Sequence, residues 1–322
     1  MNKNRRNVVT LAAVLLAAVA CSEGPTEGNK GADQDVATEQ EKLRVITFNI
    51  MCSTACERPK EYDKWKDRIP HQQQLLAEYD ADIIGLQELM PKELALFAPD
   101  GDEVAMLVAK HPEYVSIYWQ ATEADAQFTT YPDAVIYLRK SRLQVLEQGS
   151  YWLGPTPNKP LSGGYLLDKP TLPRVMVWAH VLDKVTGKKM YVANSHYDPN
   201  TPSQEHAAVD TMKRLPADRE LREHAIITGD FNANPSRDAF KTLTAKQADG
   251  VQMKESRDIA LTTKIAHNDD KEPVYETEKR IDHIFVGPAW TASNWTVDMR
   301  RFGPNNRHPS DHFLIVADLL LN

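Results

Sequence analysis

The sequence has 322 residues, of which 42% are hydrophobic and 26% are charged. This is the composition of a globular protein, and it excludes collagen-like, coiled-coil and wholly disordered chains. The formal net charge is −7, which repels DNA, RNA and anionic lipid at long range, so an anionic substrate must be held by a bound cation or by specific contacts.

The first 20 residues have the pattern of an export signal. Three basic residues precede an apolar run from Val8 to Ala20, which is too short to span a bilayer comfortably as a helix. Small residues then lead into Cys21, an order that resembles the lipobox of bacterial lipoproteins, whose cysteine becomes the lipidated N-terminus. We therefore expect residues 1–20 to be a lipoprotein signal peptide and Cys21 to carry lipid. There are two alternatives: the protein is secreted after cleavage near Cys21, or the segment stays as an uncleaved anchor. In all three cases the protein is exported.

Residues 22–41 predict a flexible tether that follows Cys21. They contain no aromatic residue and almost no large apolar one, so they cannot bury enough surface to fold. Ser22 rather than Asp follows the cysteine, which resembles the signal for outer-membrane sorting in Gram-negative bacteria. We expect an exported protein, anchored by lipid to a bacterial membrane, and in a Gram-negative host placed at the outer membrane or in the periplasm. Removal of the signal would leave 35 basic and 45 acidic residues, a net charge of about −10.

Residues 42–322 are predicted to form one domain, because no repeat and no long linker divides them. Runs of β-branched and aromatic residues predict strands, and Pro70 fits the first turn of a helix that continues to about Tyr79. Further helices are expected twice between Pro91 and Lys110, over 203–214 and from Arg237. The predicted strands cover 43–50, 82–88, 114–120, 134–139, 143–153, 175–182, 190–195, 225–228, 281–286, 295–301 and 313–320.

The order of these elements indicates two packed sheets with helices on the outside. Strands outnumber helices, and some strands follow one another directly while others are connected through a helix. Residues 154–173 are rich in Pro and Gly, which predicts a surface loop of the kind that often borders a site.

Two cysteines remain if Cys21 carries lipid. Cys52 and Cys56 are separated by three residues, and in an oxidising compartment we favour a small disulfide loop over two free thiols. A zinc site has little support, because two thiolates need partners and no second pair of Cys or His has the spacing of a zinc site.

Polar residues recur where the predicted apolar strands begin or end. A single one would ordinarily be a cap or a turn residue. Here they come from six strands and are restricted to Asn, Asp, Glu and His, which suits a Mg²⁺ phosphoester site, because Mg²⁺ takes oxygen ligands and retains waters. Hydrolysis also needs groups that orient water and stabilise charge on the transition state. The residues are Asn49, Glu88, His196, Asp230, Asn232, Asp282, Asp311 and His312.

The segments around these residues occur in a recognisable order. They are TFNI (47–50), GLQE (85–88), SHYD (195–198), GDFNA (229–233), RIDHIFV (280–286) and PSDHFLIV (309–316). From about Leu43 to Leu320 the chain resembles the endonuclease/exonuclease/phosphatase superfamily, which includes deoxyribonuclease I. Trp65, Arg68 and segments 149–154 and 173–179 resemble its bacterial metal-dependent hydrolase branch. The resemblance implies an α/β fold, a four-layer α-β-β-α sandwich of two packed mixed sheets like that of deoxyribonuclease I.

The resemblance also implies a role for each matching residue in metal and water binding. Glu88 corresponds to the main metal carboxylate, with Asn49 nearby and Asp311 completing the ligand set or supporting it. Asp230 and Asn232 correspond to the pair that orients or deprotonates the attacking water and holds the phosphate. The implied cofactor is Mg²⁺, with Mn²⁺ and Ca²⁺ as alternatives.

Other matching residues would act on the phosphate. His312 corresponds to the histidine that contacts the scissile phosphate, and Asp282 to a carboxylate partner that would raise the pKa of this histidine. His196 corresponds to a hydrogen-bond donor to the phosphate or the leaving oxygen. Arg174 is a candidate phosphate clamp, because a guanidinium offers two parallel donors to an oxyanion. Asp133 either orients His196 or is an ordinary residue at the start of a strand.

The predicted function is that of an exported, Mg²⁺-dependent phosphoesterase, in which water attacks a phosphodiester with assistance from the metal. A diester is favoured over a monoester because both histidine positions are filled. Nucleic acid, a phospholipid such as sphingomyelin, and a small phosphodiester are the substrate classes, and we expect a monomer. The alternatives are a phosphomonoesterase of the same superfamily and a catalytically silent surface lipoprotein that uses the cleft for binding. The chain lacks a dense basic stripe with interleaved aromatic residues, so no dedicated duplex-binding surface is evident.

Overall fold

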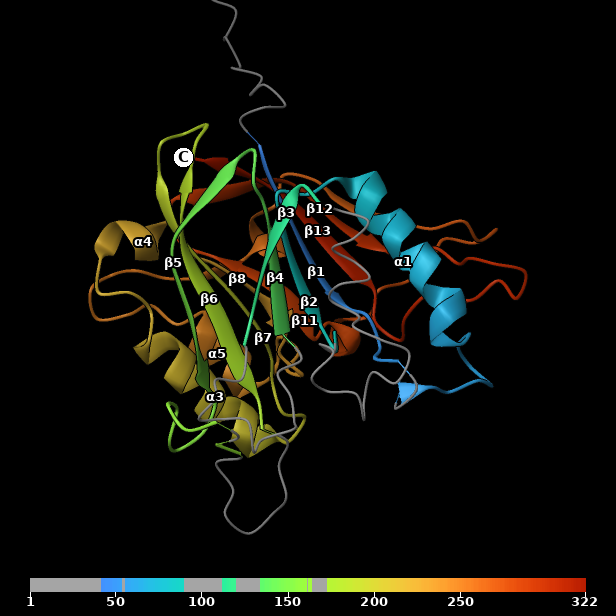
Figure 1. Cartoon of the computed structure of the whole chain (residues 1–322), viewed down its shortest axis with the longest axis horizontal. Helices are drawn as coiled ribbons and strands as arrows, with labels where there is room; N and C mark the ends of the chain where they lie inside the picture. Colours follow the sequence, from blue (N-terminus) through green and yellow to red (C-terminus); the bar gives the residue numbers. More distant parts are fainter. Residues whose placement is uncertain (1–41, 54–55, 90–111, 120–133, 161, 164–172) are drawn as a thin grey trace, which may run out of the picture. The chain divides into compact units, whose positions relative to one another are not determined.

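Strands with buried side chains build the first of two sheets. The computed structural model describes residues 42–53, 56–89, 112–119, 134–160, 162–163 and 173–322 (Figure 1). Within these residues the first sheet is mixed, because β1 runs parallel to β2 but antiparallel to β13. Its strands, in spatial order, are β10 (Thr263–Ala266), β12 (Trp290–Asp298), β13 (Leu314–Leu321), β1 (Leu43–Asn49), β2 (Ile83–Gln87), β4 (Ala134–Arg139) and β3 (Tyr114–Tyr118).

The second sheet is also mixed. Its strand β7 runs parallel to β8, whereas the other neighbouring strands are antiparallel. The strands, in spatial order, are β5 (Leu143–Trp152), β6 (Val175–Asp183), β7 (Lys189–His196), β8 (Ile226–Asp230), β11 (Asp282–Val286) and β9 (Lys254–Glu255).

The two sheets pack face to face, and helices cover their outer faces (Figure 1). Side chains such as Val45, Val177 and Ile284 fill the space between the sheets and are fully buried. Among the described residues, one helix packs on the outer face of the first sheet and three pack on the outer face of the second. The predicted four-layer sandwich is therefore confirmed. The helices are α1 (Trp65–Tyr79) on the first sheet, and α3 (Thr201–Lys213), α4 (Arg219–Glu223) and α5 (Asp238–Leu243) on the second.

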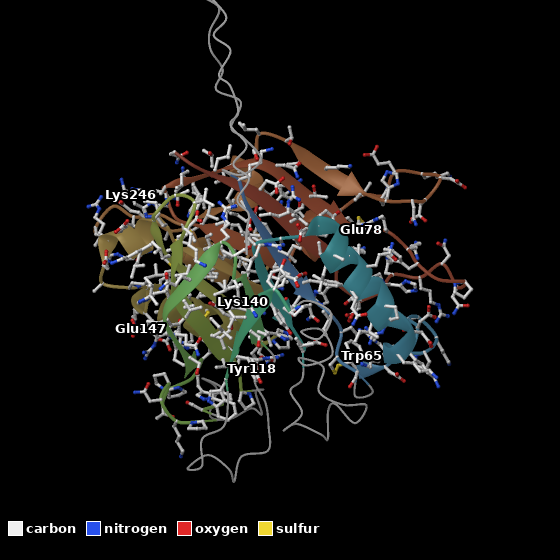
Figure 2. The ribbon with its side chains drawn as sticks, turned by 45° about the horizontal axis from the view of Figure 1, so that its top comes forward. Trp65, Glu78, Tyr118, Lys140, Glu147 and Lys246 are labelled. Carbon is white, nitrogen blue, oxygen red and sulfur yellow. A yellow bond between two sulfur atoms is a disulfide. The ribbon has the colours of Figure 1, made fainter. Side chains whose placement is uncertain are left out.

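The prediction that Pro70 starts the first helix is wrong. The helix α1 begins at Trp65, and Pro70 lies inside it on the exposed side. Trp65, labelled in Figure 2, lies on the buried side. Ile69 is also on this side, and both side chains pack against the first sheet. Burial of these side chains outweighs the one backbone hydrogen bond that the proline cannot donate.

Other differences concern the ends of elements and the shortest elements. The strand β12 begins at Trp290 rather than at 295, because Trp290 and Ala292 are buried in the core between the sheets, and its register shifts between Ala292 and Asn294. The helices predicted between Pro91 and Lys110 lie outside the described residues, as does half of the loop over 154–173. Several short elements were not predicted, because they are too short to give a periodic signal in the sequence. They are α4, β9, β10 and the 3₁₀ helices η4 (Ser256–Ile259) and η5 (Thr277–Lys279).

A buried polar network joins the two sheets near the end where β1, β2, β7 and β8 terminate. Asn194 of β7 donates its side-chain amide to the carbonyl oxygens of Leu86 and Val135 in the first sheet, at 2.8 and 2.9 Å. Its Oδ1 accepts from Gln87 Nε2 at 2.7 Å and from Thr228 Oγ1 at 3.0 Å. Because these bonds are directional, they fix how the two sheets sit against each other.

Only glycine fits beside this network at position 85. A Cβ on Gly85 would lie 2.1 Å from Thr228 Oγ1 and 2.8 Å from Asn194 Oδ1. Both distances are far inside van der Waals contact, so a side chain here would push the sheets apart. The glycine of the GLQE segment therefore allows the close approach of the sheets directly beneath the strand ends.

Candidate active site

The predicted site residues lie at strand ends that the two sheets bring to one mouth. Asn49 ends β1 and Glu88 follows β2 in the first sheet. In the second sheet the register pairs Asp230 with His196 on one side and with Asp282 on the other. The sandwich therefore assembles residues that are more than 200 positions apart in the sequence.

Asp230 lies at the centre of the site and is 1% exposed. Its Oδ2 accepts from Asn49 Nδ2 at 3.1 Å and lies 3.3 Å from His196 Nε2 and 3.7 Å from His312 Nε2. Its Oδ1 accepts the backbone N–H of Asn232 at 2.9 Å. Burial alone would raise the pKa of Asp230, but the two histidines and these hydrogen bonds hold it below its usual value. The Asp230 carboxylate is thus kept ionised.

Asn49 connects Asp230 to Glu88. Its Nδ2 donates to Glu88 Oε1 as well as to Asp230 Oδ2, at 3.1 Å in each case. Its Oδ1 accepts the backbone N–H of Met51 at 3.0 Å. In this orientation Asn49 holds two carboxylates in place through its amide nitrogen, and its oxygen is occupied by the backbone.

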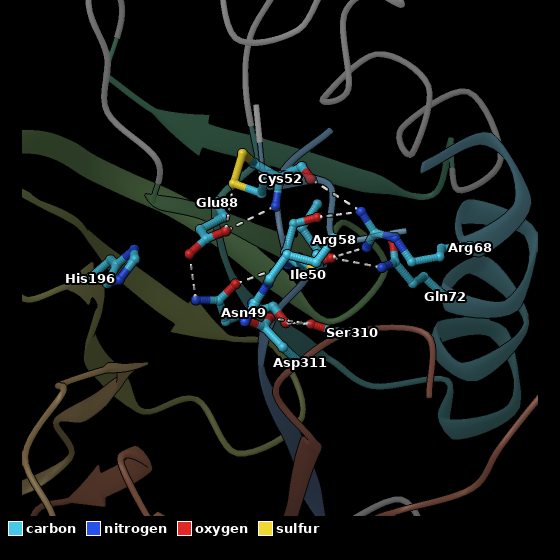
Figure 3. Close-up of a disulfide and its surroundings, with 12 residues drawn as sticks. Asn49, Ile50, Cys52, Arg58, Arg68, Gln72, Glu88, His196, Ser310 and Asp311 are labelled. Carbon is cyan, nitrogen blue, oxygen red and sulfur yellow. Dashed lines mark hydrogen bonds and ion pairs between the residues drawn. A yellow bond between two sulfur atoms is a disulfide. The ribbon is translucent and has the colours of Figure 1, made fainter. Parts of the chain in front are cut away.

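Glu88 is held on its other side by the segment after β1. The Oε2 of Glu88 accepts the backbone N–H of Cys52 at 2.9 Å and lies 3.3 Å from Cys56 Sγ (Figure 3). Cys52 and Cys56 form a disulfide. The backbone of Glu88 has a φ of 62°. Residues other than glycine rarely adopt this left-handed conformation, and those that do are often found at functional sites.

Asp282 and His312 form the second half of the site. Asp282 Oδ2 lies 2.9 Å from His312 Nδ1. Burial alone would lower the pKa of His312, but the carboxylates of Asp282 and Asp230 hold it well above its ordinary value. The ring is therefore kept as an imidazolium, which places a positive charge beside Asp230.

Arg174 lies against His196 at the start of β6. Its Nη1 is 2.9 Å from His196 Nδ1, and both side chains are buried. A guanidinium can only donate, so Nδ1 accepts and the ring proton lies on Nε2, which faces Asp230. Arg174 thus orients His196, while its contact with phosphate remains a prediction. Asp133, the other proposed partner of this histidine, lies outside the described residues.

Asp311 is placed beside Asn49 by its neighbour in the sequence. Ser310 Oγ donates to the carbonyl oxygen of Asn49 at 2.7 Å and accepts the backbone N–H of His312 at 3.2 Å. The carboxylate of Asp311 pairs with Arg58 (Figure 3). Arg58 was not predicted as part of the site, because it lies in no motif. Ser310 was not predicted either, although its position in the PSDH segment, next to Asp311, could have indicated it.

Asn232 is turned toward the chain that follows β7. Its side-chain Nδ2 donates to the carbonyl oxygen of Tyr197 at 2.9 Å, and its backbone has φ of 49°. Gln204 of α3 donates in turn to the carbonyl oxygen of Asn232 at 2.8 Å. These contacts lock the turn after β8, which carries both Asp230 and Asn232.

The donor set suits a hard divalent cation. The site offers carboxylate oxygens of Glu88, Asp230 and Asp282, and within the described residues Asp282 Oδ1 is buried without a hydrogen-bond partner. Single ligand atoms of Asp230, Asp282 and His312 also lie within 4.8 Å of one another. Oxygen donors of this kind are those that Mg²⁺ prefers.

Comparison with known proteins agrees with this geometry. The sequence profile of the Endonuclease/Exonuclease/phosphatase family matches residues 46–312. The chain belongs to this family. A comparison with curated proteins finds no match. Membership of the endonuclease/exonuclease/phosphatase family confirms the resemblance, supports hydrolysis of a phosphoester bond, and agrees with the general dependence of the family on a divalent metal.

Solved structures of this family have the same fold. An endonuclease/exonuclease/phosphatase family protein from Bacteroides thetaiotaomicron is 24% identical with a TM-score of 0.70, over 87% of this chain and 98% of that one. A mannosyl-6-phosphatase from the same species is 25% identical with a TM-score of 0.68, over 87% and 100% of the two chains. The catalytic domain of human Nocturnin, with a bound sulfate, is 19% identical with a TM-score of 0.59, over 88% and 95%.

Proposed function

We propose that this protein is a Mg²⁺-dependent phosphodiesterase. The observation that carries the proposal is the position of Asp230, which is kept ionised between the Asn49–Glu88 pair on one side and two histidines on the other. An ionised carboxylate that faces both a group of oxygen ligands and a cationic hydrogen-bond donor fits the attack of water on a phosphate.

Each residue then has a defined task. Asp230 orients the attacking water and accepts its proton. His312, as an imidazolium, offers its Nε2–H to a phosphate oxygen, and His196 offers an Nε2–H from a ring that Arg174 keeps in place. Glu88, which Asn49 holds in place, and Asp311 would hold the Mg²⁺, which when bound would supply positive charge to the phosphate oxygens. The P–O bond opposite the water then breaks without a covalent intermediate.

A phosphomonoester is the second candidate substrate. The diester is favoured because both histidines lie beside Asp230 and leave two donors for the phosphate and the leaving oxygen. The observation that supports the monoester is the similarity to the mannosyl-6-phosphatase, whose whole length this chain covers. The two candidates use the same metal and the same water and both expel an alcohol, so they differ in whether the phosphate carries a second ester group that stays on the product.

A substrate panel tests this proposal. We expect the full-length protein to hydrolyse bis-p-nitrophenyl phosphate with Mg²⁺ faster than p-nitrophenyl phosphate, and to lose this activity in EDTA. DNA, RNA, sphingomyelin, inositol phosphates, nucleotides and mannose 6-phosphate then distinguish natural substrate classes. Faster turnover of the monoesters would replace the diesterase by the phosphatase. Absence of metal-dependent turnover on the whole panel would favour the silent binding protein.

We also propose that the protein is exported and anchored by lipid on Cys21. The support is the order of basic, apolar and small residues before this cysteine, and the Cys52–Cys56 disulfide, which is typical of oxidising compartments. Among the described residues, no helix has the length and apolar content needed to cross a bilayer. Mass spectrometry of the N-terminal peptide is expected to find Cys21 as the first residue with lipid attached. An unmodified mature terminus would contradict the anchor.

A further inference from the structure

The disulfide lies directly against the carboxylate predicted to bind the metal (Figure 3). Glu88 Oε2 accepts the backbone N–H of Cys52 at 2.9 Å and lies 3.3 Å from Cys56 Sγ. The other oxygen of Glu88 accepts from Asn49. In the contacts that the structure describes, each half of the disulfide therefore touches the same oxygen of Glu88.

The backbone around Cys52 is held by the side chain of Arg68. Arg68, which is 1% exposed, donates to the carbonyl oxygens of Met51 and Cys52 at 2.9 and 3.1 Å. These bonds hold the chain up to the carbonyl group of Cys52. The Cys56 backbone N–H donates to the carbonyl oxygen of Ser53 at 2.8 Å, and the disulfide is the covalent link that holds the Cys56 sulfur against Glu88.

The segment after the disulfide reaches a second predicted metal ligand. Arg58, two residues beyond Cys56, pairs with the carboxylate of Asp311. Glu57 accepts the first N–H of helix α1 from Trp65 at 3.2 Å. Cys52 and Cys56, which the disulfide joins, thus contact Glu88, and Arg58 contacts Asp311.

Opening the disulfide would change the surroundings of Glu88 Oε2 chemically. A disulfide sulfur carries no proton, whereas a Cys56 thiol would donate to the carboxylate and a thiolate would repel it. The Cys52 N–H would stay in place, because Arg68 holds that part of the backbone, so opening the disulfide acts on Glu88 through Cys56. Partners that orient a metal ligand typically account for about 10- to 100-fold in metal affinity when they are removed.

We propose that the Cys52–Cys56 disulfide is a positioning element for Glu88, so that its reduction weakens the binding of a divalent cation. This inference rests on the proposed function, in which Glu88 is the main metal ligand. Reduction by a water-soluble phosphine converts the disulfide, the phosphine and one water into two thiols and the phosphine oxide. The bond that breaks is S–S, the sulfurs gain two electrons and two protons, and phosphorus is oxidised.

The experiment measures Mn²⁺ affinity by titration calorimetry on the full-length protein. The samples are the oxidised protein, the phosphine-reduced protein after removal of reductant under argon, and the double variant Cys52→Ser/Cys56→Ser. We expect the dissociation constant to rise about 10-fold in both opened forms, and reoxidation to restore it. At saturating Mg²⁺ the activity of the opened forms should lie within a few-fold of that of the oxidised protein. The reason is that opening the disulfide lowers the affinity for the cation more than it changes the site once the cation is bound. The matched control Cys21→Ser, which keeps the disulfide, should bind as the oxidised protein does.

Two further measurements separate the possible failures. If Glu88→Gln binds Mn²⁺ as tightly as the unaltered chain, the assignment of the metal ligand in the proposed function is wrong. If Glu88→Gln loses binding but both opened forms keep it, the proposed function stands and the role of the disulfide is refuted. Circular dichroism during heating checks that the opened forms are folded. Unfolding of both at the assay temperature would make the disulfide a general stabiliser and would also overturn the inference.

Discussion

Replacement of Glu88 by Gln is expected to reduce kcat at least about 10³-fold, which corresponds to about 4 kcal/mol of activation free energy. The substitution keeps the size of the side chain and removes the charge that Asn49 and the Cys52 N–H hold in place. Without this carboxylate the cation loses its main ligand, so the charge that develops on the phosphate is no longer stabilised.

The measurement for Glu88→Gln combines steady-state rates over a range of Mg²⁺ concentrations with Mn²⁺ calorimetry. Glu220→Gln is the matched control, because Glu220 is exposed on α4 and contacts none of the site residues in the described structure. It should leave both rate and affinity unchanged. A loss below about 10-fold for Glu88→Gln would mean that the metal is bound elsewhere.

His312→Ala is expected to cost a similar factor of at least about 10³ in kcat, because it removes the cationic donor that faces the phosphate. The pH dependence adds a more specific test. Since Asp282 and Asp230 hold the pKa of His312 well above its ordinary value, the imidazolium persists through neutral pH. Activity should therefore fall only as the pH rises through this raised pKa, whereas protonation of Asp230, whose pKa is lowered, limits activity only in acid.

Asp282→Asn isolates the cause of this shift. The amide keeps the shape of the side chain but removes the charge 2.9 Å from His312 Nδ1, so the alkaline limit of activity should move to lower pH by about one unit or more. A profile of kcat against pH for Asp282→Asn and for the unaltered chain measures the displacement. An alkaline limit that stays in place would show that His312 is not the group whose deprotonation stops the reaction.

Much of this site could be predicted from the sequence, because its residues follow strands that are recognisable by their apolar pattern. Asn49, Glu88, Asp230 and Asp282 each lie at a strand end in a motif, and sheet register brings them together. The partner of His196 could not be predicted in the same way. Arg174 lies 22 positions away in the sequence, and only the pairing of β6 with β7 places the two side chains side by side.

The parts that were missed depend on tertiary contacts. The start of α1 at Trp65 is decided by packing against the first sheet, which outweighs the local signal of Pro70. The pairing of Arg58 with Asp311 joins residues 253 positions apart, and no local sequence pattern predicts this contact. The orientation of the Asn49 amide is set by the Met51 N–H and by two carboxylates, and these become neighbours only in the folded chain.

The polar network between the sheets has a consequence for how the reaction is prepared. Thr47, Gln87, Asn194 and Thr228 belong to this network and precede Asn49, Glu88, His196 and Asp230 by one or two residues. Any sliding of one sheet over the other would break these bonds before it displaced the groups at the mouth. The carboxylates and imidazoles are consequently set at their working distances before a substrate arrives, so little reorganisation energy is spent when charge develops on the phosphorus centre.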